Sequence, residues 1–136
     1  MKKAKILSFS RLFILFAALI FEILPYGAVC VFATPEEKMR RLFSYFSLVP
    51  YGYANFAPFI TAILTCILLI LALISLLSSR SGLEKGLLFV SLAASVISLA
   101  PLLFGIEFFS IVGAIISALL FSAVALSILC RRCDNA

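Results

Sequence analysis

Residues 59–77 read FITAILTCILLILALISLL and contain no charged side chain. A helix of about 20 residues crosses a hydrocarbon core about 30 Å thick, so this apolar run predicts a membrane span. Pro58 directly before it suits the first turn of a helix, where a missing N–H breaks no bond. The stretch therefore predicts that the chain is built around a transmembrane helix.

The rest of the chain repeats this pattern. Hydrophobic residues make up 65% of the 136 residues and charged residues 12%, and the mean hydropathy is +1.26. A small soluble domain could not cover so much apolar surface, which excludes that class. Three further apolar runs predict spans at about 12–33, 87–104 and 108–130.

These runs should be helices, because backbone groups in lipid must be bonded within their own segment. Only residues 105–107 separate the last two runs, which forces an antiparallel hairpin. The sequence therefore predicts an all-α membrane protein. We expect residues 1–136 to form a single integral membrane domain, a four-transmembrane-helix antiparallel bundle.

The eleven lysines and arginines predict the orientation, since cytoplasmic flanks collect positive charge. Eight flank the spans on the side that holds both termini: Lys2, Lys3, Lys5, Arg11, Arg80, Lys85, Arg131 and Arg132. The other side holds three, Lys38, Arg40 and Arg41. We therefore expect a multi-pass protein of a plasma or bacterial inner membrane with cytoplasmic N- and C-termini. The net charge of +5 suits anionic lipid headgroups, and no grouped basic face predicts a nucleic-acid partner.

The first span has three interpretations. The run 12–33 places Glu22 near the middle of the bilayer, whereas a span over 6–24 places it at the outer interface, with Arg11 snorkelling inward. In the third interpretation the segment ending at Ala33 is a cleaved leader, which would leave three spans.

Between the first two spans we expect a short amphipathic outer helix at about 35–48. Thr34, Pro35 and Glu37 form a helix-start pattern. Apolar residues then recur at spacings of three and four: Met39, Leu42, Phe43 and Phe46. This segment would lie at the membrane surface as an anchor or lid, or would bind a partner.

Small residues predict where the last two spans contact each other, because helices in lipid approach closely through small side chains. One stripe recurs every four residues in the fourth span: Ser110, Ala114, Ala118 and Ser122. A second lies in the third span: Ser91, Ala94, Ser95 and Ser98. We expect these two stripes to pack together.

Glu22 is the leading candidate for a functional residue. A charged side chain at mid-membrane costs roughly 2.5 to 3.5 kcal/mol on insertion scales, so such residues are usually retained for a purpose. Burial would favour the neutral acid, able to bind a proton or a cationic ligand. Tyr26, in the following Pro25-Tyr26-Gly27 turn, is the second candidate for ligand or proton binding.

The four cysteines give weaker signals. Cys130 and Cys133 form a C-x-x-C spacing beyond the fourth span, which predicts a thiol pair, a lipidation site or chance placement. No histidine or second pair accompanies them, so we expect no metal site and no cofactor. Cys30 and Cys66 could reach similar depths, although lone cysteines in spans usually serve as small packing residues.

No convergent acid, base, nucleophile or metal set predicts an enzyme. We expect an accessory or interaction subunit that contacts the lipid bilayer, other membrane proteins or further copies of itself. The alternative is a small oligomeric transporter with Glu22 as its proton or cation site. Four short spans with a lone Glu in the first resemble in plan the small multidrug resistance transporters, which exchange protons for organic cations as dimers. This chain departs from them in having no Trp and a longer outer loop.

Overall fold

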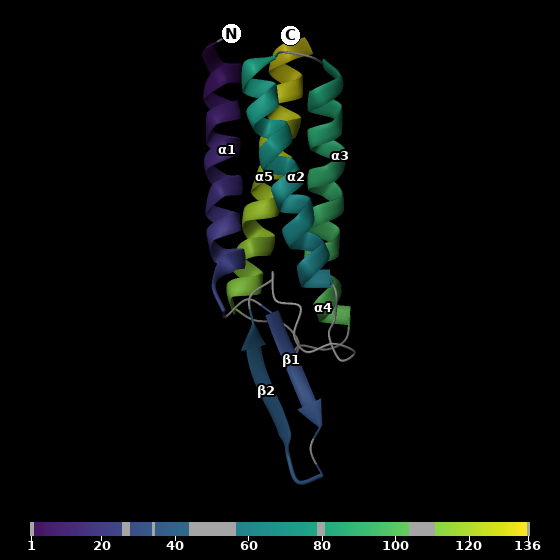
Figure 1. The fold of residues 1–136 in the computed structure, drawn as a ribbon. Coiled ribbons are helices and arrows are strands. Elements are labelled where there is room, and N and C mark those ends of the chain that lie inside the picture. Colours follow the sequence, from purple (N-terminus) through teal and green to yellow (C-terminus); the bar gives the residue numbers. More distant parts are fainter. Residues whose placement is uncertain are drawn as a thin grey trace.

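The computed structural model describes residues 2–25, 28–33, 35–43, 57–78, 81–103 and 111–135. Four long helices lie side by side, and a two-stranded hairpin projects from the end opposite the two termini (Figure 1). The elements are α1 (Lys2–Ile23), β1 (Ala28–Ala33), β2 (Lys38–Phe43), α2 (Ala57–Leu77), α3 (Ser81–Ser98), α4 (Ala100–Leu103) and α5 (Ile111–Asn135).

Three helices of the described part are long and apolar enough to cross a membrane: Lys2–Ile23, Phe59–Leu77 and Ile111–Cys133. The second coincides with the run predicted over 59–77, which confirms a helix long and apolar enough to span a membrane there. The third predicted span, over 87–104, stays a prediction, because α3 is not among these helices. The findings thus support a membrane protein with apolar helices of spanning length.

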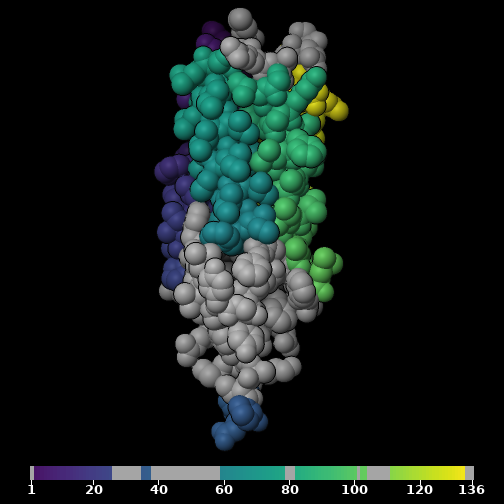
Figure 2. Space-filling model, turned by 45° about the vertical axis from the view of Figure 1, so that its right-hand side comes forward, coloured from purple at the N-terminus to yellow at the C-terminus, as the bar shows by residue number. Residues whose placement is uncertain are grey.

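The four long helices form a closed ring. α1 packs against α2 and α5, and α3 packs against the same two helices from the opposite side. Neighbouring helices in this ring run in opposite directions (Figure 1). The space-filling view shows α2 and α3 adjacent along one face (Figure 2). Groups on α1 and α3 that meet each other must therefore meet across the middle of the ring.

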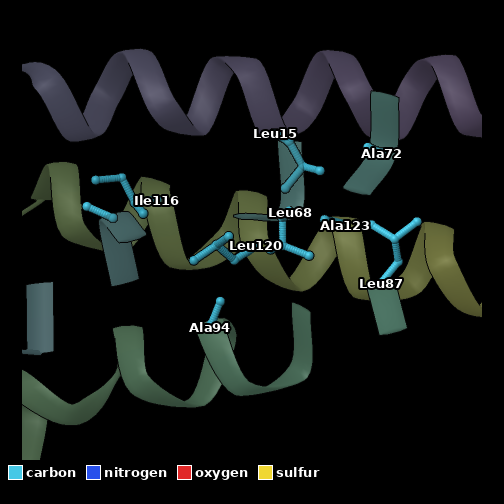
Figure 3. Close-up of a cluster of buried hydrophobic side chains, with 9 residues drawn as sticks. Leu15, Leu68, Ala72, Leu87, Ala94, Ile116, Leu120 and Ala123 are labelled. Carbon is cyan, nitrogen blue, oxygen red and sulfur yellow. The ribbon is translucent and has the colours of Figure 1, made fainter. Parts of the chain in front are cut away.

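Leucine, isoleucine and alanine side chains fill the space between the helices (Figure 3). The cluster consists of Leu15, Ala62, Leu68, Ala72, Leu87, Ala94, Ile116, Leu120 and Ala123. Small alanines beside larger leucines allow close approach of the backbones, which is how helices gain packing energy in lipid. Large apolar side chains also cover the outside, including Phe9, Phe13 and Phe16 of α1. Such an outer surface suits lipid and not water.

The first span predicted over 12–33 is wrong. α1 runs over Lys2–Ile23, close to the alternative 6–24. Pro25 explains where the helix ends, because the residue before a proline is disfavoured in helical conformation. Hydropathy had counted residues 28–33 as lipid-spanning, although β-branched and aromatic residues of this kind also suit strands.

The amphipathic outer helix predicted over 35–48 is also wrong in its described part, and residues 44–48 lie outside the described residues. β2 pairs antiparallel with β1, in a register that places Ala28 opposite Phe43 and Ala33 opposite Lys38. Of the residues between the two strands, the structure describes 35–37, and they lie outside both strands. The helical spacing of apolar residues was overridden because residues 28–33 offered a backbone partner for a strand.

The third apolar run also differs from the predicted 87–104. α3 begins six residues earlier and ends at Ser98, and α4 follows after the turn at Leu99. Pro101 explains the break, since its ring would clash with the carbonyl four residues earlier in a continuous helix. It fits instead in the first turn of α4, where no N–H is needed.

The predicted packing of small residues is half right. The α3 stripe of Ser91, Ala94, Ser95 and Ser98 is buried, as expected. The α5 stripe faces outward, because Ala114, Ala118 and Ser122 are exposed, and Ser110 lies outside the described residues. Interior positions of α5 are offset from the stripe: Gly113, Ile116, Ser117, Leu120 and Ala123.

Candidate functional site

A buried ion pair joins α1 to α3 across the middle of the ring. Arg11 is 1% exposed, and its Nη1 and Nη2 donate to Oε2 and Oε1 of Glu84 at 2.8 and 3.1 Å. This two-point geometry is the strong form of a guanidinium–carboxylate contact. The two charges balance each other inside the helices.

Serines from the remaining two helices complete this contact. Ser75 of α2 donates to Glu84 Oε1, and Arg11 Nη1 donates to Ser127 Oγ of α5 at 3.4 Å. We call Arg11, Ser75, Glu84 and Ser127 the paired layer. One polar side chain from each long helix contributes to it, and among its buried polar atoms Arg11 Nε has no hydrogen-bond partner in the described protein.

Glu22 lies in the last turn of α1 and is fully buried, at 0% exposure. Thr65 Oγ1 of α2 donates to its Oε1 at 2.8 Å. Its second oxygen, Oε2, is buried without a hydrogen-bond partner in the described protein. Neither sequence alternative foresaw this position, since Glu22 is near the end of its helix and still faces the interior.

Helix geometry places Ser117 of α5 at the same depth as Glu22. Glu22 lies eleven residues after Arg11 in α1. Ser117 lies ten residues before Ser127 in α5, which runs in the opposite direction. At 1.5 Å per residue these are both about 15 to 17 Å. Thr65 lies ten residues before Ser75 in α2, and Ser95 lies eleven residues after Glu84 in α3. These two residues are therefore at the same depth as Glu22 and Ser117. We call Glu22, Thr65, Ser95 and Ser117 the Glu22 layer, and all four are buried.

Ser117 differs from other serines in these helices. Ser95, Ser122 and Ser127 each donate to a carbonyl four residues earlier, at 2.8 to 2.9 Å. Such bonds to the preceding turn are the usual way to satisfy a serine inside a helix. Ser117 Oγ is buried and makes no hydrogen bond to any described residue. Glu22 Oε2 on α1 and Ser117 Oγ on α5 are therefore both buried, lie at a similar depth along the helices, and have no hydrogen-bond partner among the described residues.

Apolar side chains separate the two layers. Leu15, Leu68, Leu87 and Leu120, one from each long helix, belong to the apolar cluster between the helices, with Leu68 and Leu120 side by side (Figure 3). The paired layer lies toward the end that carries the termini, and the Glu22 layer lies toward the hairpin (Figure 1). The side chains of the two layers are therefore about 15 Å apart along the helices, with leucines in between.

The remaining predicted site residues are not brought to Glu22 by any described contact. Tyr26 lies outside the described residues. Cys130 and Cys133 lie in the last turns of α5, where Cys130 is buried with its Sγ 3.9 Å from Ser8 Oγ and Cys133 is exposed. Cys66 is a free thiol, so it is not bridged to Cys30. The described residues contain no group of three or more His, Cys, Asp or Glu arranged for a metal ion.

Sequence reasoning missed the paired layer. The charge pattern places Arg11 in a cytoplasmic flank, and Glu84 lies outside the predicted spans, because the span at 87–104 begins after it. A signal was present: Arg11 directly precedes one apolar run and Glu84 lies three residues before another, and charges of opposite sign that become buried require each other.

Comparisons with known proteins find no protein family, curated protein or solved structure that matches this chain. They therefore give no support to the resemblance in plan to small multidrug resistance transporters.

Proposed function

We propose that this chain is a small multi-pass transporter that uses Glu22 as its proton- or cation-binding carboxylate. The observation that carries the proposal is the buried carboxylate of Glu22, which meets no cation among the described residues, with one oxygen bonded to Thr65 and the other without a hydrogen-bond partner there. An acidic group inside a membrane protein that faces other helices usually marks an ion or proton path.

The contrast with Glu84 supports this assignment. Glu84 is balanced by Arg11 and needs no further ligand. Among the described residues the only hydrogen-bond partner of Glu22 is the Thr65 hydroxyl, and a hydroxyl cannot neutralise a carboxylate charge. Since an isolated buried charge is very costly, Glu22 must take up a proton or a cation whenever it is buried. A site that must be filled when closed and can be hydrated when open is suited to carrying ions.

The membrane setting of the proposal follows from the apolar helices. We propose that α3, in the region of the span predicted over 87–104, also crosses the membrane beside the three helices of spanning length, since it packs along α2 and α5. The charge asymmetry supports cytoplasmic termini in a cell membrane. The leader interpretation is disfavoured, because cleavage after Ala33 would remove Arg11 and leave Glu84 unbalanced. We propose no enzymatic role and no nucleic-acid partner.

Reconstituted vesicles test the transporter proposal. Purified protein is placed in liposomes that contain a pH-sensitive dye, and a proton gradient is imposed with Na⁺ or choline outside. Wild-type protein should change internal pH faster than protein-free vesicles, and Glu22→Gln should reduce the rate to the protein-free level. Glu36→Gln, an exposed carboxylate in the hairpin loop, is the matched control and should leave the rate unchanged. Wild-type flux in Glu22→Gln would refute the proposal.

A second candidate function, an accessory or self-associating subunit, is favoured by the outward stripe on α5. Ala114, Ala118 and Ser122 lie on one exposed face at four-residue spacing, and small residues at this spacing allow close contact between membrane helices. Ala118→Leu should abolish any cross-linked oligomer in membranes, while Leu73→Ala, on the exposed face of α2, should not. A chain that stays monomeric and unaccompanied in membranes would count against this function.

A further inference from the structure

We propose that the ligand of Glu22 is a proton held on its Oε1, and that Thr65 is the positioning residue that accepts the hydrogen bond of this proton. This inference rests on the proposed function, since it names the ion that the site carries. It is carried by a chain of three oxygens between α1 and α2, by the charges around Glu22 and by the end of the helix that holds it.

The chain of oxygens has two contacts. Thr65 Oγ1 lies 2.8 Å from Glu22 Oε1 and 2.9 Å from the carbonyl oxygen of Thr61, one turn earlier in α2. Both are ordinary separations of hydrogen-bonded oxygens, so each contact has room for a hydrogen atom and for no larger ion. Two protons are therefore needed to fill the two contacts.

The number of available protons assigns the state of Glu22. The Thr65 hydroxyl has one proton, and a backbone carbonyl is only an acceptor. If Glu22 were ionised, that one proton would have to serve two acceptors, and one contact would lack a hydrogen. A neutral Glu22 supplies the second proton, because its Oε1 can donate to Thr65 while Thr65 donates to Thr61. Both contacts are then satisfied.

The other oxygen of Glu22 fits the same state. Oε2 is buried without a hydrogen-bond partner among the described residues. In an ionised carboxylate this oxygen would share the negative charge, and an unsatisfied buried group is more costly when it is charged. With the proton on Oε1, Oε2 is a neutral carbonyl oxygen. A proton on Oε2 would instead be a donor without an acceptor.

No described charge on the neighbouring helices balances an ionised Glu22. α1 packs against α2 and α5. The titratable residue of α2 is Cys66, a free thiol. The titratable residues of α5 begin at Cys130, toward the end of the molecule that carries the termini. The closest basic residue in α1 is Arg11, which is about 15 Å away along the helix and is paired with Glu84.

The end of α1 also favours the neutral acid. Glu22 is in the last turn of this helix, where unbonded carbonyls create a partial negative charge. The last turn contains no basic residue. An ionised carboxylate is repelled by this helix end, whereas a protonated one carries no charge to be repelled.

Release of the proton should therefore open the contact between α1 and α2 at this depth. An ionised Glu22 gains a charge that needs water, and the chain of oxygens loses one of its two protons. In the arrangement described here, Glu22 and Thr65 are both 0% exposed. We infer that this arrangement is the closed, proton-loaded form of the site, and that hydration of Glu22 accompanies exchange of its proton.

Infrared difference spectroscopy of the full chain in lipid vesicles, between acid and alkaline pH, tests this inference. The wild type should show a protonated carboxylic acid band that is absent in Glu22→Gln. Its titration midpoint should be the same in NaCl and in choline chloride at equal ionic strength. Thr65→Val removes the acceptor, so the band should move to the position of an acid without a hydrogen bond, and the apparent proton affinity should fall about tenfold.

Two further variants separate this role of Thr65 from a general effect on packing. Thr65→Ser keeps the hydroxyl and should retain the wild-type band position. Ser91→Ala removes a buried hydroxyl that bonds to its own helix in α3, and it should leave both the band and the proton affinity unchanged.

Three results would overturn the inference. The first is the lack of a protonated band that depends on Glu22. The second is a band that keeps its position in Thr65→Val, or a proton bound more tightly in that variant, because Thr65 would then act as a donor to an ionised carboxylate. The third is a midpoint that falls when Na⁺ replaces choline, because an alkali cation would then compete for the site. If Thr65→Val does not fold, the comparison of NaCl with choline in the wild type decides.

The outcomes distinguish this inference from the proposed function. Glu22-dependent proton flux, with a band that does not respond to Thr65→Val, would overturn the inference and leave the transporter in place. A band that responds as expected, in vesicles whose wild-type protein carries no proton flux, would refute the transporter and leave the protonated site.

Discussion

The paired layer and the Glu22 layer contain similar side chains but differ in how the charge of their glutamate is balanced. Each takes one polar side chain from every long helix, and each places a glutamate in the interior. In the paired layer Glu84 receives bonds from Arg11 and Ser75. In the Glu22 layer the carboxyl group has one hydrogen-bond partner, Thr65, and meets no cation among the described residues.

This difference shows how a role is assigned to a buried charge. A balanced pair holds helices in a fixed arrangement and is strongly destabilised only when one partner is lost. An unbalanced carboxylate gains little by staying buried and depends on a ligand. We therefore assign Glu84 to structure and Glu22 to binding, although a count of acidic residues would treat them alike.

The largest effect is expected in the paired layer. Glu84→Gln would leave the Arg11 charge buried without a counter-charge, so we predict a loss of about 3 to 5 kcal/mol in unfolding free energy. Thermal or denaturant unfolding in detergent measures it. The double variant Arg11→Met/Glu84→Leu removes both charges and should recover most of the loss. A loss below about 1 kcal/mol in the single variant would show that the pair is not structural.

A smaller effect of opposite sign is expected at Glu22. Glu22→Gln removes the unbalanced charge while keeping an acceptor for Thr65, so in choline buffer we predict unchanged stability or a gain of about 1 kcal/mol. The same unfolding measurement in choline tests it, with Glu36→Gln as the exposed control. A loss as large as that of Glu84→Gln would mean that Glu22 too is structural.

The sequence predicted the membrane class and the span at 59–77 because apolar length alone determines them. It failed at the first and third spans for a physical reason. Hydropathy penalises Arg11 and Glu84 individually, whereas the folded protein joins them across the helices. Likewise, residues 28–33 are apolar enough to be predicted as part of a span. They lie outside the first helix because α1 ends before Pro25 and because β1 pairs with β2.

The candidate site could be predicted only in part. Glu22 was identifiable as a lone acid in an apolar run, yet its burial depends on how α1 packs against α2. Thr65 had no distinguishing signal, since many hydroxyl side chains in these helices bond to their own backbone. Its significance emerges only from its contact with Glu22.

The assignment of Glu22 to ligand binding and Glu84 to structure is tested most directly by infrared difference spectroscopy of the full chain in lipid vesicles as the pH is raised. We predict a change in the carboxyl bands that disappears in Glu22→Gln, because raising the pH should remove the proton of Glu22 and leave the Arg11–Glu84 pair unaffected. The same band change persisting in Glu22→Gln, or no carboxyl change with pH in the wild type, would contradict the account.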